Sequence, residues 1–104
     1  MTKVVFYEKD ERLTGFLIKD HSDYDDEGYD IVCASISSAA YLTANTLTEI
    51  VGAKADIEVR EAYLRFILKD KFTEAESHLK GLKLHLESLA QDYSQYISCK
   101  TETV

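Results

Sequence analysis

The sequence predicts an α+β domain in which two helices pack on an antiparallel-rich sheet, with the elements in the order ββαββαβ. Three patterns predict it: short β-rich runs that alternate in polarity, two longer segments with apolar residues at helical spacing, and a final strand-like run. The 104 residues contain no proline, and we find no internal repeat or linker. We therefore expect one domain over residues 1–104.

The first half of the chain predicts a hairpin followed by a helix. Strands are expected at residues 3–7 and 13–19, and an acidic loop follows them. Asp30 is an N-cap candidate for a helix over residues 31–51, because a short carboxylate accepts hydrogen bonds from the free amides of a first turn. Gly52 then suits the residue after the helix end. One face of this helix carries small residues: Ala34, Ala39, Ala40 and Ala44.

The second half predicts another hairpin, a second helix and a last strand. Alternation changes phase near residues 60–62, which indicates a tight turn between two strands. Thr73 and Glu76 have the spacing of a capping box at the start of the second helix. Residues 95–100 resemble an edge strand, and residues 101–104 are expected to fray.

Composition limits the classes of function. The formal net charge of −7 disfavours direct nucleic-acid binding and favours basic partners. The N-terminus lacks the apolar core of a signal peptide, and no apolar run approaches the ~20 residues of a membrane span, so we expect a cytoplasmic protein. Cys33 and Cys99 form neither a disulfide framework nor a zinc pattern, and no metal or cofactor is predicted.

His21 and Cys33 lie at the two ends of the acidic loop. With Asp30 as cap, Cys33 is the third helical residue, where the helix dipole and unpaired amides favour a thiolate. The same amides would suit the oxyanion of an attacked carbonyl. The alternative is a half-buried structural cysteine, because free cysteine is among the most buried residue types. The residues alone leave both interpretations open.

The run Asp30-Ile31-Val32-Cys33-Ala34, with Gly28 before it and His21 upstream, resembles the signature of the ribosomal-processing cysteine proteases, the Prp family. These small bacterial enzymes remove an N-terminal extension from large-subunit ribosomal protein twenty-seven. The resemblance implies that Cys33 is the nucleophile and His21 the base, and that Asp30 and Ser37 support catalysis. One departure is visible, because Asp20 stands where the family usually has glycine.

The resemblance thus implies a homodimeric cysteine endopeptidase whose partner is the precursor of a large-subunit ribosomal protein. Asp30 either orients His21 or only caps the helix. The acidic loop is either a flap that moves to admit a peptide or a merely solvated loop, and Tyr24 and Tyr29 are placed to contact an extended substrate. The alternative function is a non-enzymatic acidic homodimeric module that binds a ribosomal protein or another basic partner, and Asp20 would then mark a drifted site.

Overall fold

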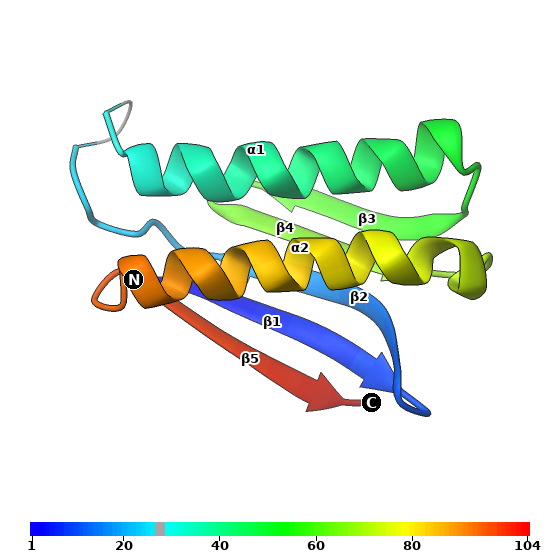
Figure 1. Ribbon diagram of the computed structural model, residues 1–104. Helices are drawn as coiled ribbons and strands as arrows, with labels where there is room; N and C mark the ends of the chain where they lie inside the picture. The colour runs from blue at the N-terminus through cyan, green and yellow to red at the C-terminus, as the bar shows by residue number, and fades with distance from the viewer. Residues whose placement is uncertain (27–28) are drawn as a thin grey trace.

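A computed structural model describes residues 1–26 and 29–104 of the chain. In this described part, five strands form one sheet in the order β3-β4-β2-β1-β5, and both α-helices lie on the same face of it (Figure 1). The element order and the two-layer arrangement confirm the predicted fold class. Gly28, which the sequence analysis placed at the end of the acidic loop, lies outside the described residues, as does Glu27.

Two hairpins build most of the sheet. β1 (Thr2–Lys9) and β2 (Arg12–Lys19) are antiparallel and longer than predicted, and a two-residue turn joins them. Both turn residues, Asp10 and Glu11, have positive φ, as the favoured two-residue hairpin turns require. β3 (Ala55–Arg60) and β4 (Tyr63–Leu68) form the second hairpin, with its turn at the predicted phase change.

α1 (Ile31–Asn45) begins at the predicted cap, because the Asp30 side chain accepts a hydrogen bond from the Cys33 amide. It continues into a π-helical turn, η1 (Thr46–Ile50), before Gly52 takes a positive φ of 78°. The predicted helical stretch is therefore present, but its last turn is wider than an α-helix. Leu47 of this wider turn is fully buried in the core.

α2 (Phe72–Asp92) begins differently from the prediction. Its cap residue is Lys71, which has a left-handed backbone and makes no side-chain cap bond. The expected capping box is therefore wrong: Thr73 and Glu76 lie inside the helix, and Glu76 pairs with Lys80 at 3.0 Å. Because α2 already begins at Phe72, directly after left-handed Lys71, Thr73 is a helical residue and cannot occupy the cap position.

β5 (Ile97–Thr103) is an edge strand, as predicted, and runs parallel to β1. The expectation that residues 101–104 fray is wrong. Pairing with β1 continues to Thr103, and the Val104 amide donates to the Glu8 carbonyl at 2.8 Å. Backbone pairing along β1, rather than side-chain burial, holds these exposed residues in place.

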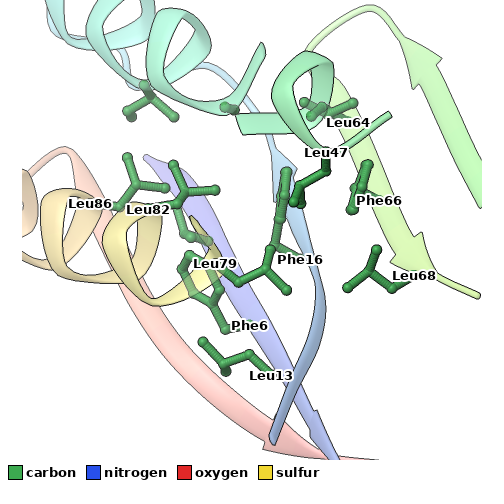
Figure 2. Close-up of a cluster of buried hydrophobic side chains, with 14 of the residues drawn as sticks. Phe6, Leu13, Phe16, Leu47, Leu64, Phe66, Leu68, Leu79, Leu82 and Leu86 are labelled. Carbon is green, nitrogen blue, oxygen red and sulfur yellow. The ribbon is translucent and has the colours of Figure 1, made fainter. Parts of the chain in front are cut away.

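The core lies between the sheet and the helices. Figure 2 shows phenylalanines of the sheet facing leucines of α2 and of the turn after α1. Phe16 and Phe66 stack with ring centroids 5.3 Å apart, and Leu79 and Leu86 of α2 are fully buried. α1 buries mainly its smaller residues, which are Val32, Ile36, Ala40 and Ala44. This packing fixes the first turn of α1 close to the end of β2.

Candidate active site

The candidate site forms where the chain leaves β2 and enters α1, at one end of the sheet (Figure 1). Neighbouring strands hold the exit from β2. The Asp20 amide donates to the Ala62 carbonyl at 2.8 Å, and the Thr2 hydroxyl donates to the Asp20 carbonyl at 2.9 Å. His21 and Ser22 follow directly and so have a fixed starting point.

Ser22 is the residue in direct contact with the Cys33 sulfur. Its backbone amide donates to Cys33 Sγ at 3.2 Å, and its hydroxyl lies 3.5 Å from the same sulfur. Ser22 is only 1% exposed, whereas Cys33 is half-buried and lines a surface hollow. The sulfur therefore lies at the surface of the site and not deep in the apolar core.

Asp30 connects the loop to the helix. One carboxylate oxygen accepts from the Cys33 amide at 2.9 Å, and the other accepts from the Ser22 hydroxyl and from the Tyr24 amide. Burial alone would raise the pKa of Asp30, but the hydrogen bonds from Ser22, Cys33 and Tyr24 outweigh it and lower that pKa. Asp30 is therefore a carboxylate at neutral pH. The described residues place it as the helix cap and give it no hydrogen bond to His21.

His21 is exposed and lies on the rim of the site. Two adjacent surface hollows share three of the predicted site residues: His21, Cys33 and Ser37. Within the described part of the chain, His21 makes no hydrogen bond to Cys33. The structure thus brings all four predicted residues to one place but leaves the imidazole unattached to the sulfur.

Two amides at the start of α1 already have acceptors. The Cys33 amide bonds the Asp30 side chain, and the Ala34 amide bonds the Asp30 carbonyl at 3.0 Å. The sequence-based idea that such amides receive an oxyanion therefore does not apply to these two in this arrangement.

Tyr24 and Tyr29, which the sequence analysis placed beside the site, behave differently. The Tyr24 ring packs edge-on against Tyr93 and Tyr96, with centroids 5.6 and 5.1 Å apart, and so ties the loop to the C-terminal end of α2. Tyr29 is 76% exposed and remains available for contact with a ligand.

Cys99 is remote from this arrangement. Its sulfur lies 3.6 Å from the Leu86 carbonyl, and burial, with a contribution from Glu87, raises the pKa of its thiol. The part of the chain that the structure describes contains no group of three His, Cys, Asp or Glu side chains placed to hold a metal. None of its helices has the length and apolar character needed to cross a bilayer.

Comparison with known proteins gives this arrangement a family. The family model described as cysteine protease Prp matches residues 1–98. The chain belongs to the Prp family. The ribosomal processing cysteine protease Prp of Staphylococcus aureus is 24% identical over 89 residues, which cover 83% of this chain and 84% of the relative.

Solved structures agree with the Prp fold. A crystal structure of S. aureus Prp with a covalently linked product peptide superposes with a TM-score of 0.92, at 23% identity, and covers 98% of this chain and 100% of that one. A second, with a substrate peptide, has a TM-score of 0.86 at 22% identity and the same coverage. A Streptococcus mutans protein has a TM-score of 0.86 at 19% identity, over 100% of this chain and 96% of that one. The predicted family, fold class and enzyme class, a cysteine protease of the Prp family, are confirmed.

Proposed function

We propose that the chain removes the N-terminal extension from the precursor of large-subunit ribosomal protein twenty-seven, with Cys33 as nucleophile and His21 as base. The observation that carries this proposal is the position of the sulfur between two hollows that share His21, Cys33 and Ser37. Because Cys33 lines both hollows, an extended peptide that occupies both would bring one of its carbonyl groups near the nucleophile.

The first hollow suits an apolar or aromatic side chain of the substrate. Its volume is about 200 Å³, and it is lined in part by Ile18, Ile36 and Leu64. The Arg60 guanidinium stacks on Tyr63 at its edge, 3.9 Å from the ring centroid. An extension that ends in apolar or aromatic residues, as the family resemblance implies, matches this lining.

The second hollow is acidic and suits the basic character of a ribosomal protein. It is lined by Asp23, Asp25, Asp26 and Asp30 as well as by the shared residues. The net charge of −7 adds long-range attraction for a basic partner. Both features favour a basic protein over nucleic acid as the ligand.

The chemistry follows from the residue types. His21 accepts the Cys33 proton, and the thiolate adds to the peptide carbonyl to form a tetrahedral intermediate. The carbon–nitrogen bond then breaks, and the new amine leaves with the proton from His21. Water hydrolyses the resulting thioester, which releases the second product and restores the thiol. In this proposal Asp30 fixes the start of α1, and Ser37, one helical turn after Cys33, bonds the substrate from the same face.

We also propose that the chain acts as a single-domain homodimer in the cytoplasm, where its substrate is made. A dimer surface is available on the side of the sheet away from the helices. Val4 and Phe6 point into the core, so Val5 points to the opposite face, where it lies beside Leu17 of β2.

The proposed function is tested with the unprocessed ribosomal protein and the same protein made without its extension. Mass spectrometry of the products should show one cut in the unprocessed protein and none in the protein made without its extension. Cys33→Ala should abolish the cut, while Cys99→Ala, the matched control, should retain it because Cys99 lies outside the site. Full cleavage by Cys33→Ala would overturn the assignment of the nucleophile.

A further inference from the structure

The hydroxyl of Ser22 has its whole hydrogen-bonding capacity committed. It donates to the Asp30 carboxylate, it accepts from the Tyr24 amide at 3.3 Å, and it faces the Cys33 sulfur at 3.5 Å. A serine hydroxyl has one proton and two lone pairs. Because the proton goes to Asp30, the hydroxyl has only a lone pair to offer the sulfur.

This arrangement fixes the direction of the contact between Ser22 and Cys33. A carboxylate can only accept, so the proton in the Ser22–Asp30 bond belongs to Ser22. The lowered pKa of Asp30, the net result of stabilising hydrogen bonds that outweigh its burial, keeps that group ionised at neutral pH. In its contact with Cys33 the Ser22 hydroxyl can therefore only accept, so the thiol is the donor across the 3.5 Å between Sγ and Oγ.

We infer that Ser22 is a positioning residue of the active site, whose amide and hydroxyl hold the Cys33 sulfur in place and whose hydroxyl accepts a hydrogen bond from the thiol in the resting enzyme. Asp30 acts on Cys33 through Ser22 as well as through the helix cap. The inference rests on the proposed function only in taking Cys33 as the nucleophile.

Removing the hydroxyl should have two opposite effects. The thiol loses its acceptor, while the Ser22 amide still donates to the sulfur, so the thiolate forms more readily. The sulfur also loses one of its two contacts with Ser22, so it is held less firmly for attack on a peptide. General damage to the fold would expose Cys33 and speed its alkylation at every pH, whereas loss of the hydroxyl should change the pH dependence of alkylation.

Other charged groups face the same space and stay constant in this comparison. Those that line the two hollows with Cys33 are His21, Arg60, Asp20, Asp23, Asp25 and Asp26. The phenols of Tyr41 and Tyr63 also line the first hollow. Because no variant below alters these groups, a change in thiol reactivity reports on Ser22.

The test measures alkylation of Cys33 by iodoacetamide between pH 5 and pH 9, read by peptide mass spectrometry, alongside kcat/KM for peptide cleavage. In Ser22→Ala we expect alkylation at pH 6 to be about fivefold faster and kcat/KM to be about tenfold lower. Ser22→Thr, which keeps a hydroxyl, should restore the wild-type pH profile. Ser35→Ala is the matched control, because that exposed hydroxyl donates to the Ile31 carbonyl of its own helix.

Unchanged or slower alkylation of Cys33 in folded Ser22→Ala would overturn the inference. If that variant does not fold, Ser22→Gly takes its place, since it also keeps the amide and lacks the hydroxyl.

The Raman spectrum of Cys99→Ala, in which Cys33 is the sole thiol, tests the resting state without altering Ser22. We expect an S–H stretch at pH 5 at the frequency of a hydrogen-bonded thiol, and a band at the frequency of a free S–H would contradict us. Alkylation and Raman data test the role of Ser22 without any cleavage assay. If the wild-type protein and its variants all fail to cleave the ribosomal protein, that result counts against the proposed function and not against the role of Ser22.

Discussion

Asp20 adopts a left-handed backbone, with φ of 70°, immediately before His21. The family resemblance places glycine here, and glycine is the residue that takes this conformation without steric cost. Aspartate is one of the few other residues that tolerate it. In this chain its carboxylate also pairs with Lys3 at 3.2 Å. The departure is therefore accommodated by the local backbone and does not indicate a drifted site.

Asp30 should make stability depend on pH through its own carboxylate. Burial opposes the charge on Asp30, but the hydrogen bonds to its carboxylate outweigh burial and lower its pKa in the folded chain. At a pH between this lowered pKa and the unfolded value of about 3.9, Asp30 therefore binds more protons in the unfolded chain than in the folded one. Its contribution is thus present above pH 4 and is lost as the pH falls through the folded pKa. We expect Asp30→Asn to lower the free energy of unfolding by about 1 kcal/mol at pH 7, and this deficit should shrink toward pH 3.

Urea unfolding from pH 7 to pH 3 measures this deficit. Asp25→Asn is the control, because Asp25 is exposed and, among the described residues, its side chain accepts one hydrogen bond, from the next amide at 2.7 Å. A deficit of Asp30→Asn that stays constant over the whole pH range would contradict the prediction.

The residues of the site were only partly readable from the sequence. Cys33, His21 and Asp30 could be singled out because a helix cap and a thiol–imidazole pair have recognisable residue types and spacing. Ser22 was missed because its partners, Asp30 and Cys33, lie 8 and 11 residues away and meet it only when the loop folds back. Its position next to His21 was the available signal, but serine in a polar loop does not predict burial.

At Gly15 the backbone of β4 leaves β2 no room for a side chain. A Cβ atom at this position would lie 2.2 Å from the Phe66 carbonyl oxygen, which belongs to the backbone and cannot turn away. Gly81 is the opposite case, because it lies inside α2 with open space around it. The two glycines therefore form a matched pair for the same substitution.

We expect Gly15→Ala to lower the free energy of unfolding by about 3 kcal/mol, because the two strands must move apart. Gly81→Ala should raise it by about 0.5–1 kcal/mol, since alanine loses less backbone freedom in a helix. Thermal and urea unfolding of both variants measure these changes. Equal effects of the two substitutions would show that the approach of β2 to β4 is looser than described.

At the level of elements, periodicity was sufficient for the order and type of every strand and α-helix. The errors lie where a local rule met a tertiary constraint. Thr73 and Glu76 have capping spacing, yet the chain enters α2 through left-handed Lys71. The wide turn at Thr46–Ile50 follows no residue signal that we recognise. Thr101 and its neighbours look like a free tail in sequence because a parallel partner 95 residues earlier is invisible to local patterns.

For the whole molecule, the two layers leave one face of the sheet without a helix (Figure 1). Val5 is 6% exposed on that face, and Leu17 beside it is partly buried.

If this face forms the proposed dimer, sedimentation equilibrium should give twice the 11.8 kDa monomer mass. Leu17→Lys should shift the protein to monomer, because it places a charge in the contact while Val5, which the monomer already covers, stays unchanged. Gln91→Lys, at an exposed position of α2 in the other layer, is the control, and a wild-type protein that stays monomeric at high concentration would refute the dimer.

Pairing of the last strand with the first sets the order in which a nascent chain can complete its sheet. β1 is synthesised before the other four strands of the described sheet and β5 after them, so Ile97 meets Thr2 only once the rest of that sheet has been made. The first hairpin, the loop and α1 are all translated before residue 46. Ser22, Asp30 and Cys33 can therefore assemble early, while the outer edge of β1 stays exposed until β5 pairs with it.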